Sequence, residues 1–122
     1  MDNNCQVICF TAMGEPASKS NSRRFVSHGG KPRFIKSKKA LDFIQLFQMQ
    51  IPTNIPPIGG DVKVTIKIYY ASRRPDLDES VILDAMQGYC YENDRQVKEK
   101  HIIWGLDREN PRSEIKIEKL EP

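Results

Sequence analysis

The chain has 122 residues and a formal net charge of +3. Hydrophobic residues make up 39% and charged residues 29%, which is typical of a folded globular domain and argues against a disordered chain. No apolar run approaches the roughly 18 residues of a membrane-spanning helix, and the N-terminal residues lack the basic segment of a signal peptide. The three cysteines form no CxxC pair, which favours a reducing cytosol and argues against a disulfide framework or a zinc knuckle.

The charge is distributed unevenly along the chain. Residues 1–75 contain 12 Lys and Arg against 4 Asp and Glu, whereas residues 76–122 contain 7 against 12. A basic half joined to an acidic half predicts a polyanionic partner for the first and a different task for the second.

Residues 4–12 predict a strand that is apolar on both faces and therefore lies inside a sheet. Cys5, Val7 and Cys9 would share one face of that strand. Cys5 and Cys9 have the spacing of possible metal ligands, but no second pair of Cys or His lies nearby, so burial in the core is the favoured interpretation.

Residues 14–33 are rich in Gly, Pro, Ser and Asn, which predicts a long loop. No acidic residue occurs between residues 16 and 41, and Phe25 and Phe34 lie among the cations, where they could stack on bases or anchor the loop. A charge run is often only a solvated face, but the absence of counter-charges favours phosphate binding, and we expect residues 14–36 to form a basic DNA-binding loop. The basic residues of this window are Lys19, Arg23, Arg24, Lys31, Arg33, Lys36, Lys38 and Lys39.

The middle of the chain predicts a helix and a strand. Ser37 is a suitable N-cap for a helix over residues 38–50, whose apolar stripe comprises Ala40, Phe43, Ile44 and Phe47. Residues 61–71 alternate strictly between apolar and polar positions, which indicates a half-exposed strand. Its apolar side comprises Val62, Val64, Ile66 and Ile68.

The C-terminal part predicts a short helix over residues 79–87, capped by Asp78 and ended by Gly88. Two further strands are expected at about residues 96–105 and 113–120. The chain should therefore be a single α/β domain over residues 1–122, with a small mixed sheet and two main helices.

A group of acidic residues follows the central strand. Asp76 and Asp78 come directly after Pro75, and in extended chain these two carboxylates lie on the same side. Two carboxylates about 4 Å apart repel each other by roughly 4 kcal/mol at an effective dielectric constant of about 20, so a cation or a proton must offset them. Their hard oxygen atoms suit Mg²⁺ or Mn²⁺, which could activate water beside a phosphodiester, and Asp94 offers a third ligand.

Arg73 and Arg74 precede these acids and could grip the same phosphate in a bidentate manner. The alternative is structural: Asp78 caps a helix, Asp76 pairs with Arg74, and Asp94 opens a turn. The DxD spacing alone does not decide between the two interpretations.

The stretch PDLDE…LDAMQGYCYENDRQV resembles the signature of the RusA family of Holliday-junction resolvases, in which DLDN is followed by a helix with a Lys, then LDAL, a Gly and DDxQV. The segments SKSNSRR and GKPRFIKSKKALDF also resemble the N-terminal part of phage and prophage members. Together these matches cover most of residues 14–97.

The resemblance implies a small, homodimeric, Mg²⁺-dependent endonuclease with a mixed α/β fold that nicks four-way DNA junctions symmetrically in DNA recombination and repair. The metal-binding acids of the family fall on Asp76, Asp78 and Asp94, with Asp84 as a supporting acid. The protein would act in the bacterial cytoplasm and could be encoded by a phage or prophage.

The chain departs from the family pattern in three respects. Glu79 replaces an amide, and Asn93 replaces the first acid of the DD pair. The segment between Asp78 and Asp84 is also two residues shorter than the usual spacing of the family; if the gap is placed after Glu79, the family's catalytic Lys falls on Ser80. Arg74 or Lys98 could supply the missing cation. Otherwise the protein would bind branched or single-stranded nucleic acid and cut it poorly or not at all.

Overall fold

The fold is built on a mixed four-stranded sheet. The computed structural model describes residues 6–17, 23–74 and 77–121. Strand order in the sheet is β1-β6-β4-β5; β4 and β5 are parallel, whereas β6 runs antiparallel to both β1 and β4. The predicted α/β class is confirmed. The strands are β1 (Val7–Met13), β4 (Val62–Tyr70), β5 (Val97–Leu106) and β6 (Arg112–Lys119).

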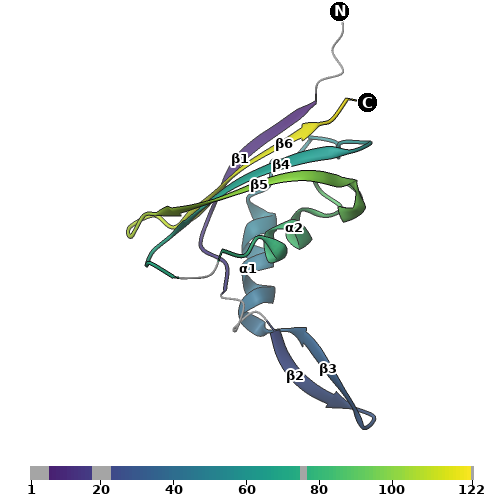
Figure 1. Ribbon diagram of the computed structural model, residues 1–122, viewed down its shortest axis with the longest axis vertical. Helices are drawn as coiled ribbons and strands as arrows, with labels where there is room; N and C mark the ends of the chain where they lie inside the picture. The colour runs from purple at the N-terminus through teal and green to yellow at the C-terminus, as the bar shows by residue number, and fades with distance from the viewer. Residues whose placement is uncertain (1–5, 18–22, 75–76, 122) are drawn as a thin grey trace, which may run out of the picture.

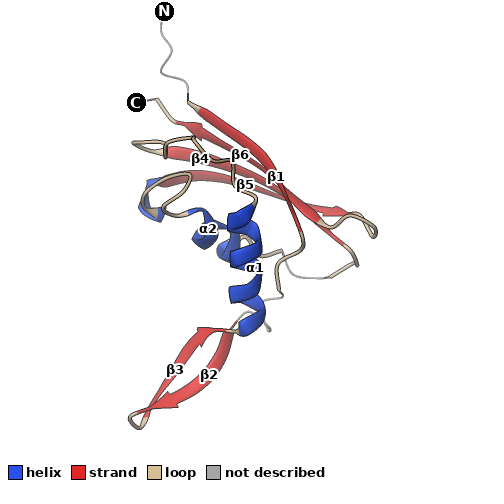
Figure 2. Cartoon of the chain, turned by 180° about the vertical axis from the view of Figure 1, so that it is seen from behind, coloured by secondary structure: helices blue, strands red, loops and turns tan. Residues whose placement is uncertain are grey.

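Two helices, α1 (Lys38–Met49) and α2 (Ser80–Met86), cover one face of this sheet (Figures 1 and 2). The core lies between the two layers: α1 contributes Phe43 and Phe47, and α2 contributes Ile82 and Met86. No helix within the described residues is long and apolar enough to span a membrane.

The predictions for the middle of the chain are confirmed. The β4 side chains alternate strictly between buried and half-buried along the whole strand, because one face packs on the helices. Ser37 caps α1, and its hydroxyl oxygen accepts a 3.2 Å hydrogen bond from the Ala40 amide. Ile44 is partly buried against the core beside the other residues of the predicted stripe.

Helix α2 is shorter than predicted and begins one residue later. Glu79, rather than Asp78, occupies the N-cap position, and its side chain makes no capping hydrogen bond. Gly88 follows the helix with φ of +88°, a left-handed conformation that favours glycine, so its predicted role in ending the helix is confirmed.

The prediction of an interior N-terminal strand is wrong. Among the strands that the structure describes, β1 forms an edge of the sheet and pairs only with β6. Its outer face is open to solvent, so Cys9 is exposed and not part of the core. Cys5, its predicted companion, lies outside the described residues.

The predicted loop contains a β-hairpin. Strands β2 (Arg23–His28) and β3 (Lys31–Lys36) pair antiparallel and project away from the sheet and helices (Figure 1). Gly29 and Gly30 join them with φ of 60° and 78°. This pair of positive angles matches a tight two-residue hairpin turn that suits Gly-Gly. Only one residue, Ser37, separates β3 from α1.

Candidate active site

Asp78 is a buried, oriented carboxylate at the start of α2. Only 8% of the residue is exposed. Its Oδ1 atom accepts a 3.0 Å hydrogen bond from the Ser80 amide and a 2.8 Å bond from the Ser80 hydroxyl. Within the described residues, Oδ2 makes no hydrogen bond or ion pair. Ser80 therefore fixes the carboxylate and leaves one oxygen available for a ligand.

Glu79, the residue next to Asp78, is held by a lysine from the sheet. The Lys100 Nζ atom lies 2.6 Å from Glu79 Oε2, and the two side chains are 48% and 19% exposed. Strand β5 thus brings a positive charge to the acidic end of α2. Lys100 was not among the predicted site residues, because no local sequence pattern connects it with Glu79, which lies 21 positions earlier in the chain.

Asp94 lies in a short 3-10 helix, η2 (Asp94–Gln96), after the C-terminal end of α2. Its amide donates a 3.1 Å hydrogen bond to Gln87 Oε1. Asn93 and Gln96 form a capping box around η2, and the Gln96 side chain also donates hydrogen bonds to the carbonyl oxygens of Ile58 and Gly60. Asn93 therefore holds the Asp94 backbone in place, although it cannot act as an acid.

Gln96 is a positioning residue that the sequence analysis missed. The spacing of Asn93 and Gln96, with two residues between them, is the pattern of a capping box and could have identified Gln96.

The exposed carboxylate of Asp94 makes no hydrogen bond or ion pair within the described residues. It is therefore accessible to a ligand.

Asp84 lies on the exposed side of α2, where Lys36 reaches it from the base of the hairpin. The Lys36 Nζ atom is 3.4 Å from Asp84 Oδ2, and both side chains are a little over 40% exposed. Tyr91 lies beneath this region and is fully buried; its hydroxyl donates a 2.8 Å hydrogen bond to the Leu83 carbonyl. Burial raises the pKa of Tyr91, and the negative charges of Cys90, Asp94 and Asp84 raise it further.

Two of the three predicted metal-binding acids, Asp78 and Asp94, lie within the described residues, and Asp76 lies outside them. The described residues contain no group of three His, Cys, Asp or Glu side chains that could hold a metal ion. Asp78 precedes α2 in the chain and Asp94 follows it. Two accessible carboxylates fit the oxygen ligands that Mg²⁺ or Mn²⁺ prefers.

Most of the predicted DNA-binding cations lie on the hairpin and at the start of α1. Arg23 and Arg24 fall in β2, and Lys31, Arg33 and Lys36 in β3. Lys38 and Lys39 are exposed in the first turn of α1, where Lys38 pairs with Asp42 at 2.9 Å. Lys19 lies outside the described residues. The structure therefore places seven predicted cations on one continuous segment.

Arg73 and Arg74 have different surroundings. Arg73 is exposed. The Arg74 side chain is only 15% exposed; it donates a 2.6 Å hydrogen bond to the Pro16 carbonyl and lies 3.8 Å from Glu15 Oε1. Its guanidinium group also stacks over the Tyr70 ring, 4.2 Å from the centroid. These contacts give Arg74 a structural role, and its binding to phosphate stays a prediction.

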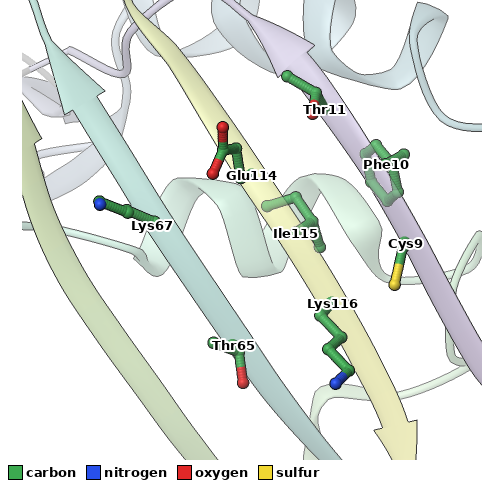
Figure 3. Close-up of a pocket in the computed structure, with 8 residues that line it drawn as sticks. All are labelled: Cys9, Phe10, Thr11, Thr65, Lys67, Glu114, Ile115 and Lys116. Carbon is green, nitrogen blue, oxygen red and sulfur yellow. The ribbon is translucent and has the colours of Figure 1, made fainter. Parts of the chain in front are cut away.

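A shallow groove of about 450 Å³ lies on the opposite face of the sheet, between β1, β6 and β4 (Figure 3). Its polar lining includes Thr65, Lys67, Glu114 and Lys116. Neither Asp78 nor Asp94 lines it, so the groove is separate from the acidic end of α2.

Comparison with known proteins identifies a family. The sequence model of a family described as Endodeoxyribonuclease RusA matches residues 14–118. A search of curated proteins found no match. The matched region includes the hairpin, both helices, Asp78 and Asp94.

Proposed function

This chain belongs to the RusA endodeoxyribonuclease family, whose members resolve Holliday junctions, and on that premise we propose that it cuts four-way DNA by paired, symmetric, Mg²⁺-dependent nicks. Mn²⁺ could replace Mg²⁺. The observation that carries the proposal is the buried carboxylate of Asp78, which Ser80 orients and which keeps one oxygen available.

The proposed chemistry uses the three acids of the sequence pattern, Asp76, Asp78 and Asp94. A divalent ion bound there would supply charge neutralisation at the phosphate and an acidified water molecule. Asp78 contributes a ligand whose direction is fixed before binding, because two hydrogen bonds already hold its other oxygen. Fixing a ligand in advance lowers the cost of ordering the site.

The hairpin and the start of α1 form the proposed DNA-binding surface. Their cations would bind backbone phosphates without reading base sequence, which suits a protein that recognises the shape of a junction. Lys36 connects this surface to α2 through Asp84. The bound strand would thereby be directed toward the acids.

We also propose that the protein is a homodimer. A junction has paired strands to cut, and a two-fold dimer presents two equivalent sites. Since its substrate is DNA, we place the protein in the cytoplasm of a bacterial host cell, with a phage or prophage as a possible origin.

The test is cleavage of a labelled four-way junction with Mg²⁺ or Mn²⁺ by the wild type and by Asp78→Asn. We expect metal-dependent paired nicks that disappear in Asp78→Asn. The matched control is Asp61→Asn, which changes an exposed acid just before β4. Asp61→Asn should cut at the wild-type rate.

The second candidate function is a binder of branched or single-stranded nucleic acid that cuts weakly or not at all. The presence of Ser80 where the family has a lysine favours it. Junction binding that weakens steeply with salt, without nicks from the wild type in either metal, would support the binder and exclude the nuclease.

A further inference from the structure

Lys100, in strand β5, extends to the acidic residues that precede α2. Its ammonium nitrogen lies 2.6 Å from Glu79 Oε2, and Glu79 is bonded to Asp78 in the chain. Glu79 is 19% exposed, so its charge is largely shielded from water, whereas Lys100 is 48% exposed and remains accessible. An ammonium group has three donors, and the contact with Glu79 uses one of them.

A β-bulge directs Lys100 to this position. Val62 pairs with Val97 and Lys63 pairs with Glu99, so Lys98 is an extra residue in β5. Beyond the bulge, Lys100 pairs with Val64, whose side chain is buried on the helix-covered face. Because strand residues alternate between faces, an uninterrupted register would place Lys100 on the opposite face.

The same bulge also places Ile102 and Trp104 against the core, so packing alone could account for it. The contact with Glu79 is the additional observation, because Lys100 is the charged member of an otherwise apolar row. Arg74, one of the two cations considered from the sequence, is already held by Pro16 and Glu15.

We propose that Lys100 is the catalytic cation of the cleavage site, with Glu79 as the residue that positions it. Its ammonium contacts the phosphate that is cut and offsets the negative charge that grows there during cleavage. It transfers no proton. This role rests on the proposed nuclease function. It also accounts for Glu79 at the position where the family pattern has an amide, because the carboxylate of Glu79 holds Lys100.

The test compares Lys100→Met, Lys100→Arg, Glu79→Gln and the double variant Glu79→Gln/Lys100→Met. The matched control is Lys63→Met, since Lys63 lies 3.9 Å from Glu99 on the opposite face of the same two strands. Four quantities are measured: the single-turnover nicking rate at saturating protein, junction affinity in Ca²⁺, Mn²⁺ affinity by calorimetry, and Tm.

We expect Lys100→Met to reduce the nicking rate by about 100-fold, as the loss of one charge-stabilising donor does in other enzymes. Mn²⁺ affinity and Tm should change little, because the residue is half exposed. Junction affinity should fall far less than the rate, because Lys100 is one of many cations proposed to contact phosphates. Lys100→Arg should recover much of the rate. Glu79→Gln should slow nicking less than Lys100→Met, and Lys63→Met should match the wild type.

The double variant separates two roles of Lys100. If Lys100 only neutralises Glu79, removing both charges restores the wild-type rate and overturns the proposal; if Lys100 contacts the phosphate, the double variant stays as slow as Lys100→Met. An undiminished rate in Lys100→Met overturns only the role of Lys100. A wild type that binds junctions but never nicks them overturns the nuclease function and the role of Lys100 together.

Discussion

The Ser80 hydroxyl donates a 2.8 Å hydrogen bond to the same Asp78 oxygen that accepts the Ser80 amide. Ser80, on which the family lysine is predicted to fall, therefore makes its own contact with the candidate site in this chain. It does not supply a charge, but it sets the direction of the carboxylate that we expect to bind metal.

Replacing Ser80 with Ala tests this relationship. The hydrogen bond from the Ser80 amide remains and the one from its hydroxyl is lost. This loss should cost about 1 to 2 kcal/mol and slow nicking roughly 5- to 30-fold. Junction affinity in Ca²⁺ should stay at the wild-type value. Ser80→Thr keeps the hydroxyl and is the control; equal slowing in both variants would contradict the role of the hydrogen bond.

Arg73 and Arg74 should respond differently to truncation. Arg74→Ala removes the hydrogen bond to Pro16 and the stacking on Tyr70, and should lower the free energy of unfolding by about 1 to 3 kcal/mol. Arg73→Ala should leave stability unchanged and weaken junction binding, since Arg73 is exposed. Denaturation in urea and a binding titration give the two quantities; a stable but weakly binding Arg74→Ala would show that Arg74 binds phosphate.

The hairpin should contribute charge rather than sequence recognition. Replacing Lys31 and Arg33 with Gln should lower junction affinity and reduce the slope of log affinity against log salt by about 1.8, if each residue neutralises one phosphate. The control is Lys116→Gln, which removes an exposed charge from the opposite side of the sheet. An unchanged slope in the hairpin variant would mean that these residues do not contact DNA.

Stability should decrease at high pH because of two buried residues. Burial raises the pKa of the Cys90 thiol from 9.0 to about 12, and burial is also the main cause of the raised pKa of Tyr91. The folded state keeps these protons, whereas the unfolded chain loses them above about pH 9 and pH 10. The stabilisation is therefore complete below pH 9 and is lost as the pH rises toward 12.

Denaturant titrations between pH 7 and pH 11 would measure this decrease. In Cys90→Ala the decrease should begin near pH 10 instead of pH 9, because only Tyr91 then contributes. An identical pH profile in the wild type and Cys90→Ala would show that Cys90 is not the titrating group.

The sequence predicted best those elements that one periodic pattern determines. Strand β4 alternates over its whole length and lies in the middle of the sheet, and the N-cap, stripe and length of α1 agree with the structure to within one residue. Both elements derive their pattern from a single buried face, which is the signal that periodicity reports.

The failures have different physical causes. The apolar residues of β1 predicted two buried faces. However, β1 is an edge strand and no layer of the described residues covers its outer face, so Val7 and Cys9 are exposed. The hairpin was not predicted, because its many charged residues show no clear apolar–polar alternation. Gly29 and Gly30, which lie between two strands of equal length, are nevertheless the signal of a two-residue turn. The bulge at Lys98 cannot be read from the chain at all, and it decides that Lys100, rather than Lys98, reaches Glu79.

Because only Ser37 separates β3 from α1, the length of the hairpin sets how far the DNA-binding surface extends from α1. Strand β3 has six residues, which at about 3.4 Å each give an arm of about 20 Å from Lys36, beside Asp84, to the glycine turn. Successive phosphates of one B-DNA strand are about 3.4 Å apart along the helix axis, so the arm is as long as about six base pairs. Nuclease protection should therefore extend about six base pairs from each nick along one junction arm, and lengthening the hairpin by two residues per strand should extend it by about two more.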